Sequence, residues 1–206
     1  MTTMQSWQLF KRDANEQIVG WYGGHPRGIR AQDWPRCRVC GAAMCHMAQM
    51  DAGPWLDLGE YHRLSVFICH ATGGHCEDWD PFKGSNAVLL HSEKNNTLFD
   101  GPPTVRVYRR VMLTARELSV EPDFGSSTQE EDPRLQTFRH DKIGGQPVWI
   151  THSVGPVNRQ GTPLPMLMQL TTDLVKFDIT ASGMAYVFFD ARAGRDSRAY
   201  LLWQGV

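Results

Sequence analysis

Short apolar runs, bounded by Gly, Pro, Asn and Asp, recur along the whole chain. Runs that alternate apolar with polar positions, or that stay apolar over a few residues, indicate β-strands. We find no long stretch of helical periodicity in the sequence and expect one short helical turn, at residues 134–139. The pattern therefore predicts a mainly β fold (β-rich α+β). The predicted strands are residues 7–10, 64–69, 87–90, 105–111, 147–150, 166–170, 185–189 and 200–203.

Several of these runs come in pairs at one spacing. Gly-Gly-His-Pro at residues 23–26 returns as Gly-Gly-Gln-Pro at 144–147, a shift of 121 residues. Ala-Gln-Met at 48–50 and Val-Phe-Ile at 66–68 return as Met-Gln-Leu and Val-Phe-Phe, at shifts of 120 and 121. Internal similarity at a fixed period indicates a repeated unit. The sequence thus predicts two pseudo-repeated β units packed together, with coincidence among Gly-rich turns as the alternative.

The chain divides at a polar stretch between the two copies. Residues 121–140 contain Pro122, Gly125 and several acidic and serine side chains, a composition typical of a connector. We therefore expect a first unit at residues 1–120 and a second unit at residues 141–206.

The cysteines carry the clearest chemical signal. The chain has 5 cysteines, an odd number, which favours metal binding over a disulfide framework. Cys37-Arg-Val-Cys40 has the spacing of a zinc-ribbon-like knuckle, in which both thiolates face one ion across a tight turn. Cys69 and Cys76, separated by a Gly-Gly pair, follow a predicted strand and can supply the second pair. We predict one structural Zn²⁺ held by these four thiolates, with no open position for a substrate.

Other ligand sets remain open at this point. One further cysteine and three histidines can each replace Cys69 or Cys76: Cys45, His46, His70 and His75. Reduced cysteines buried in a core are a third interpretation. At the repeat spacing, the four predicted ligands correspond to Asn158, Gly161, Asp190 and Ser197. The second unit therefore has no thiolate, and only one metal site is expected.

Charge and hydropathy limit the partners. Lys and Arg number 21 against 22 Asp and Glu, so the net charge of −1 provides no overall field for a nucleic acid backbone. The N-terminus lacks an apolar leader segment, and no window approaches the roughly 18 apolar residues of a membrane-spanning helix. We expect a cytoplasmic protein with a protein partner, without direct nucleic acid or membrane binding.

Motifs of known catalysts do not appear. The sequence has no Walker A motif, dinucleotide fingerprint or nucleophile elbow. His-Ser-Glu at residues 91–93 resembles one half of a zinc deaminase motif, but the Cys-x-x-Cys lies upstream of it rather than downstream. We therefore predict that the chain is not an enzyme, with an enzyme of unrecognised type as an alternative.

Several motifs carry a resemblance to a known family. They include Lys-Ile-Gly-Gly-x-Pro-x-Trp at 142–149, Met-x-Met-Gln-Leu at 166–170, Gly-Met-Ala-Tyr-Val-Phe-Phe at 183–189 and Tyr-Leu-Leu-Trp-Gln at 200–204. Together they resemble the YwqG-like family of bacterial proteins of unknown function. The cysteine-bearing first unit, with Cys-Glu-Asp-Trp-Asp-Pro at 76–81, is similar to its zinc-bearing members and to the related programmed cell death protein 2.

The resemblance implies a two-copy β fold used for protein contacts, and some relatives are encoded beside polymorphic toxins as apparent immunity proteins. We therefore predict a non-enzymatic immunity protein that binds and neutralises a cognate bacterial toxin, possibly a nuclease. The alternative is a chaperone or adaptor that binds a partner at a sheet edge. An inhibitor of a basic nuclease can present carboxylates where phosphates would lie. The candidate surface consists of Glu121, Asp123, Glu130, Glu131 and Asp132.

Overall fold

Ten antiparallel strands form one sheet in the computed structural model, which describes residues 5–70, 76–118, 125–177, 182–192 and 196–205. Two short 3-10 helices are η1 (Ala31–Asp33) and η2 (Pro133–Phe138). The strands are β1 (Ser6–Lys11), β2 (Gly20–Tyr22), β3 (Cys45–Asp51), β4 (Arg63–Ile68), β5 (Asn86–His91), β6 (Val111–Leu118), β7 (Lys142–Gly144), β8 (Met166–Leu170), β9 (Met184–Asp190) and β10 (Arg198–Gln204). The prediction of a mainly β fold is confirmed.

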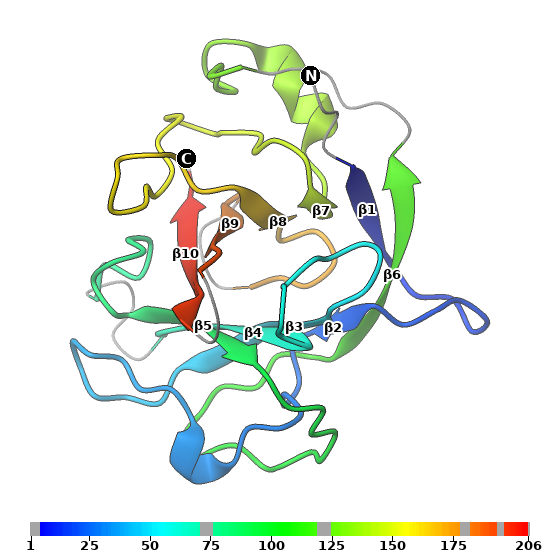
Figure 1. Cartoon of the computed structure of the whole chain (residues 1–206), viewed down its shortest axis with the longest axis vertical. Coiled ribbons are helices and arrows are strands. Elements are labelled where there is room, and N and C mark those ends of the chain that lie inside the picture. Colours follow the sequence, from blue (N-terminus) through cyan, green and yellow to red (C-terminus); the bar gives the residue numbers. More distant parts are fainter. Residues whose placement is uncertain (1–4, 71–75, 119–124, 178–181, 193–195, 206) are drawn as a thin grey trace.

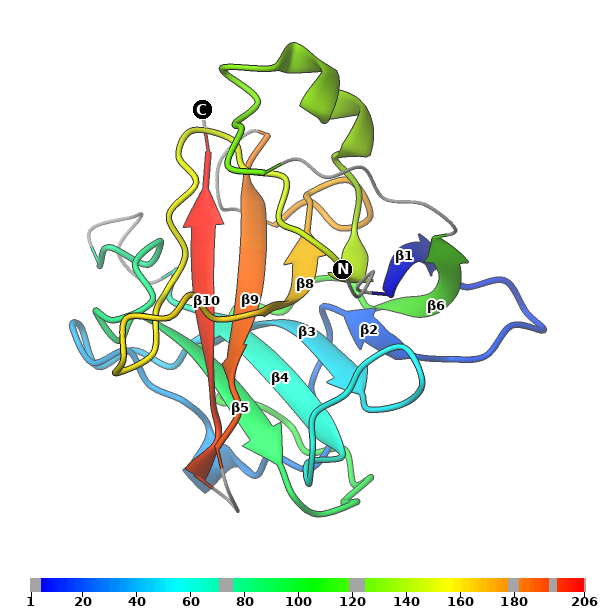
Figure 2. The same cartoon turned by 45° about the horizontal axis from the view of Figure 1, so that its top comes forward.

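The sheet curls until its two ends approach each other. The strand order is β10-β9-β8-β7-β1-β6-β2-β3-β4-β5. β10 and β5, the terminal strands, lie side by side without pairing, as Figures 1 and 2 both show. The sheet is therefore nearly closed, and two strand edges face each other across a gap.

The curl creates an inner core and two outer clusters. Along a strand, successive side chains point to opposite faces. Val66 and Val187 accordingly lie in the inner core, whereas their neighbours Phe67 and Phe188 lie in separate outer clusters. The long loops of the first unit cover the cluster around Phe67, which also contains Trp34 and three cysteines. This outer cluster holds the candidate site.

Six of the eight predicted strands are confirmed, and so is the helical turn, which appears as η2. The prediction of a strand at 147–150 is wrong. Backbone donors there bond to side-chain amides, because Gln169 Oε1 accepts from Val148 N at 2.8 Å and Gln204 Oε1 accepts from Ile150 N at 2.9 Å. The prediction for 105–111 is also wrong, since the strand in this region begins only at Val111. We did not predict β2, β3 or β7.

Contacts of the first unit recur in the second at the predicted spacing. Gln49 Oε1 accepts from Arg27 N at 2.9 Å, as Gln169 Oε1 does from Val148 N, with all numbers shifted by 120 or 121 residues. A register shift follows His46 in β3 and Met166 in β8. The order β2-β3-β4-β5 at one end of the sheet also matches β7-β8-β9-β10 at the other. The origin of both units from one repeated unit stays a prediction.

The two units share the middle of the sheet. β1 pairs with β6 on one side and with β7 of the second unit on the other. The fully buried Tyr22 donates a hydrogen bond to Asp141 Oδ1 at 3.0 Å, which links β2 to the segment before β7. Strands of both units thus belong to one continuous sheet. The division of the chain at residues 120 and 141 stays a prediction. None of the helices among the described residues is long and apolar enough to cross a membrane.

Candidate metal centre

Four cysteines from three separate segments converge on one point. Cys37 and Cys40 lie in the knuckle before β3, Cys69 follows β4, and Cys76 precedes β5. Their four Sγ atoms all lie within 4.8 Å of one another. Cys37, Cys69 and Cys76 are buried, whereas Cys40 is exposed. The structure thus brings together the four cysteines that the sequence predicted, in a cluster that can hold a metal ion.

The sulfur separations suit a tetrahedral ion. With Zn–S bonds of about 2.3 Å, neighbouring sulfurs of a tetrahedral site lie about 3.8 Å apart. The Sγ atoms of Cys40 and Cys69 are 3.6 Å apart. The upper limit of 4.8 Å exceeds the tetrahedral edge by only about 1 Å, so small side-chain rotations bring all four sulfurs to bonding distance. The cluster fits a metal that prefers four thiolates.

A tight turn builds the knuckle. Gly41 has φ +74°, the left-handed conformation that a residue with Cβ rarely adopts. This turn lets Cys37 accept a hydrogen bond from Gly41 N at 2.9 Å and donate one to Ala42 O at 2.8 Å. Both sulfurs of the Cys-x-x-Cys segment therefore face the same side.

The other two ligands are held by the segment that leads into β5. Cys69 N donates to Ser85 O at 2.8 Å, and Ser85 Oγ donates to Cys76 O at 2.5 Å. Ser85 itself is fully buried. Phe67 and Trp34 pack edge to face beside these cysteines, with ring centroids 5.4 Å apart. One buried serine thus fixes the backbone of both cysteines.

Local hydrogen bonds favour the thiolate form of Cys40. The backbone of Ala42 hydrogen-bonds to the Cys40 sulfur and lowers the pKa of this thiol, and the other three sulfurs of the cluster act in the same direction. Metals bind the thiolate rather than the thiol. Cys40, the exposed cysteine of the cluster, is therefore favoured in the form that binds a metal ion.

The alternative ligands Cys45 and His46 lie outside the cluster. Cys45 belongs to the inner core, and its burial raises the pKa of its thiol. His46 is buried, and its Nδ1 lies 3.2 and 3.0 Å from the carbonyl oxygens of Gly23 and Gly24. Burial lowers the pKa of His46 to about 4. Cys45 and His46 are thus held by contacts outside the sulfur cluster.

The remaining two alternative ligands are His70 and His75. His70 Nε2 lies 2.9 Å from the hydroxyl of Tyr108, and the two rings pack edge to face. His75 lies outside the described residues. Within the described part of the chain, only the four cysteines form a group with metal-ligand spacing.

The corresponding positions of the second unit also form a turn with a left-handed glycine, but this turn is one residue shorter. Asn158 N donates to Thr162 O at 2.9 Å, and Gly161 has φ +79°. The Asn158 side chain accepts from the backbone of Gln160 and of Thr162, both at 2.9 Å. This side-chain cap stabilises the turn.

The two remaining counterparts are also tied locally. Asp190 accepts from Arg192 Nε at 2.9 Å. Ser197 Oγ accepts from Arg192 N at 3.0 Å and donates to Arg192 O at 3.1 Å. Both counterparts thus form hydrogen bonds with Arg192.

No family model and no curated protein matches this chain. The resemblance to the YwqG-like family therefore stays a prediction.

The predicted acidic surface is only partly described. Glu121 and Asp123 lie outside the described residues. Glu131 accepts from both the backbone and the hydroxyl of Thr128, and Asp132 caps η2 and pairs with Arg134 at 2.8 Å. Glu130 is exposed. Two of the three described carboxylates thus have local structural roles.

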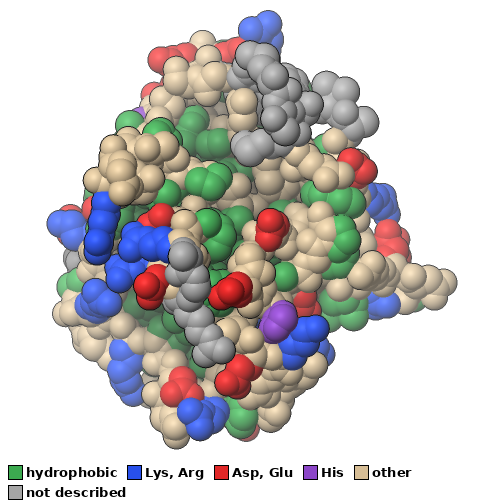
Figure 3. All heavy atoms as spheres, viewed as in Figure 1, with side chains coloured by type: hydrophobic (Ala, Val, Ile, Leu, Met, Phe, Trp, Pro, Cys, Tyr) green, Lys and Arg blue, Asp and Glu red, His purple; other side chains and the backbone are tan. Residues whose placement is uncertain are grey.

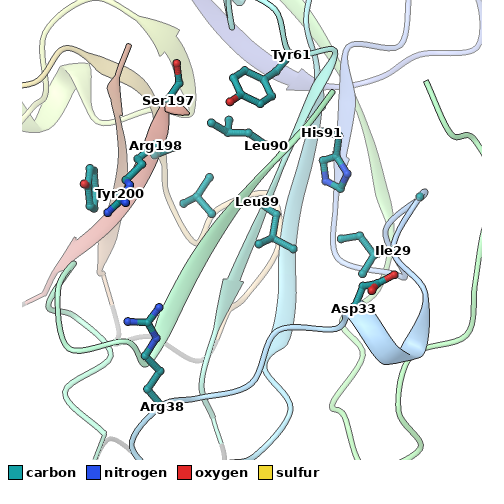
Figure 4. A pocket seen from close by; sticks show the side chains of 13 residues that line it. Ile29, Asp33, Arg38, Tyr61, Leu89, Leu90, His91, Ser197, Arg198 and Tyr200 are labelled. Atoms are coloured by element: carbon teal, nitrogen blue, oxygen red, sulfur yellow. The ribbon is translucent and has the colours of Figure 1, made fainter. Parts of the chain in front are cut away.

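A second feature escaped the sequence analysis. A cleft of about 620 Å³ opens between β5 and β10 (Figure 4). Its walls come from the knuckle, η1, β5, Tyr61 and the start of β10. These segments are far apart in sequence and meet only because the sheet curls, so no local motif indicated the cleft.

Proposed function

We propose that the chain is a non-enzymatic protein-binding module whose first unit is stabilised by one structural Zn²⁺. The observation that carries this proposal is the cluster of Cys37, Cys40, Cys69 and Cys76, with four sulfurs within 4.8 Å. Zinc prefers such a soft, four-thiolate set, and four protein ligands leave no position for water or substrate. The metal would act by joining the knuckle to β4 and to the segment before β5.

We further propose that the bound partner is a toxin and that the chain acts as an immunity protein. The resemblance described above and the expected absence of catalytic motifs support this reading. Acidic and basic side chains are interspersed over the face shown in Figure 3. A mixed surface of this kind suits recognition of a protein better than of a uniformly charged polymer.

A chaperone or adaptor is the second candidate, and one observation favours it. Among the described strands, β5 and β10 each pair with one neighbour, so each has one edge that no other strand of the sheet covers by pairing. Exposed edges of this kind bind partners by strand addition. Stoichiometry and partner range separate the two candidates, because an inhibitor binds one partner tightly and an adaptor binds several.

Co-expression tests the proposed function directly. The chain is produced in cells together with the toxic product of its neighbouring gene, with growth and the purified complex as readouts. We expect growth to be restored and an equimolar complex to be recovered. Protection without a complex, or protection by a small fraction of an equivalent, would mean that the chain acts as a catalyst and would reject the proposal.

The acidic residues give a narrower prediction. Changing Glu130, Glu131 and Asp132 to lysine is expected to slow association with a basic toxin about tenfold or more at low salt, because charge pairing mainly affects the on-rate. Stopped-flow mixing measures the rate. The matched control reverses the exposed carboxylates Glu60, Glu93 and Asp100. Equal rates for both variants would exclude this surface.

A further inference from the structure

The gap between the ends of the sheet is built as a binding groove. Val88, Leu89 and Leu90 of β5 and Ala199 of β10 provide its apolar walls. Hydroxyl groups stand at its borders, from Tyr61, Ser197 and Tyr200 (Figure 4). Binding sites commonly combine an apolar lining with a few polar groups that fix orientation.

Two arginines enter the groove from opposite walls. Figure 4 shows the side chain of Arg38 extending from the knuckle toward the side chain of Arg198, which comes from the start of β10. Neither guanidinium forms a hydrogen bond or ion pair with another residue that the structure describes. The groove's carboxylate, Asp33, is already paired with Arg30 at 2.7 Å. Basic side chains also gather beside the start of β10 in Figure 3.

The position of Arg38 is fixed by its surroundings. Arg38 N donates to Gly84 O at 2.9 Å. Gly84 has φ +80°, and a Cβ there would lie 2.6 Å from Arg38 Cδ, so the arginine stem lies directly over this glycine. Because Arg38 stands between Cys37 and Cys40, the proposed metal also holds one wall of the groove.

The backbone at the groove suits an extended chain. β5 and β10 are the ends of the sheet, and neither pairs with a second strand among the described residues. Near the end of β10, Trp203 N donates to Trp79 O at 3.3 Å. The rings of Phe82 and Tyr200 pack at 5.5 Å beside the start of β10, and Phe82 is 63% exposed. The ring of Phe82 thus adds exposed apolar surface beside Tyr200, which lines the groove.

We propose that this groove docks an extended segment of the partner protein, and that Arg38 and Arg198 bind an aspartate or glutamate side chain of that segment. The inference rests on the proposed protein-binding function and assigns it a site and a ligand chemistry. Guanidinium groups match carboxylates geometrically through paired N–H donors. For this reason we assign an acidic side chain to the docked segment. The apolar walls suit apolar side chains of the docked segment. The strand edges suit an extended backbone, which can bind by strand addition.

Selection of displayed peptides tests this site. Random ten-residue peptides are selected on the zinc-loaded full chain, and the recovered sequences are measured by fluorescence anisotropy. We expect sequences in which Asp or Glu alternates with apolar residues. Arg38→Glu and Arg198→Glu are expected to weaken their binding roughly tenfold to hundredfold, since attraction becomes repulsion. Arg159→Glu, an equal charge change at the counterpart of Arg38 in the second unit, is expected to leave binding unchanged.

Other outcomes overturn the inference. These are the recovery of no peptide, peptides without an acidic residue, or equal binding to all three variants. Inorganic phosphate and single-stranded RNA are measured in parallel, and tight binding of either one without peptide binding would also overturn it. Arg198 lies outside the knuckle, so its variant separates loss of the groove from loss of metal. A toxin complex that survives Arg198→Glu would reject the groove and leave the proposed function standing.

Discussion

Replacing Cys69 with serine is expected to remove the metal and to destabilise the first unit by several kcal/mol. Structural zinc contributes roughly 10–16 kcal/mol of apparent binding free energy in small zinc domains, comparable with the whole stability of a protein domain. Serine keeps the size of the side chain but offers a protonated hydroxyl instead of a thiolate. Three sulfurs alone would leave the buried thiols of Cys37 and Cys76 without their ion.

Cys45→Ser is the matched control for this prediction. Cys45 and Cys69 are 3% and 2% exposed, so the two variants introduce a buried hydroxyl at sites of equal burial. Of these two cysteines, only Cys69 belongs to the sulfur cluster. Zinc content and the midpoint of thermal unfolding are measured for both variants, with and without a chelator. Equal loss of stability in the two variants would show that the cluster holds no structural metal. The same conclusion would follow if the chelator left the unfolding midpoint of the wild type and of both variants unchanged.

Asp141→Asn is expected to change how stability depends on pH. Asp141 is buried where β2 of the first unit meets the segment before β7, and burial raises the pKa of its carboxyl to about 7. The unfolded chain has the ordinary value near 3.8. The folded chain therefore retains this proton up to about pH 7, and stability from this group is lost as the pH rises from about 4 to 7.

The variant removes this titration and keeps most of the local hydrogen bonds. An asparagine oxygen can still accept from Thr171 N and from Tyr22, which lie 2.7 and 3.0 Å from Asp141 Oδ1. Relative to the wild type, the variant should gain stability between pH 4 and 7, by up to a few kcal/mol, and show a constant difference above pH 7.

The comparison has to be made as a difference because two histidines titrate in the same range. Burial lowers the pKa of His46 and of His91 to about 4, so their contributions to stability are lost as the pH falls from 6.5 toward 4. Both histidines are present in both proteins and cancel in the difference. Urea unfolding at several pH values measures it, and a difference that does not depend on pH would show that Asp141 is ionised in the folded chain throughout this range.

The sequence was informative where structure depends on local pattern. Short continuous apolar runs identified the terminal strands β5 and β10, and the Cys-x-x-Cys spacing identified the knuckle. β3 escaped because six of its seven residues are buried, including His46 and Gln49, so it has no alternation of apolar and polar positions. Residues 147–150 were wrongly predicted as a strand because Val148 and Ile150 are buried, as strand residues are. Their backbone N–H groups bond to the side-chain amides of Gln169 and Gln204 instead of to another strand.

The choice of ligands shows the same limit. Spacing alone could not exclude Cys45 or His46 from the metal site, because both lie close to the knuckle in sequence. Their positions in β3 place Cys45 in the inner core and direct His46 toward the carbonyls of Gly23 and Gly24. The groove between β5 and β10 depends on the curl of the whole sheet, which no local pattern encodes.

We propose that four thiolates from three segments close around one zinc ion. Zinc-edge X-ray absorption on the purified full chain, together with its metal content, tests this most directly. We predict one zinc per chain with four sulfur neighbours at about 2.3 Å and no nitrogen or oxygen neighbour. A metal-free folded protein, or a zinc with fewer than four sulfurs, would contradict the account.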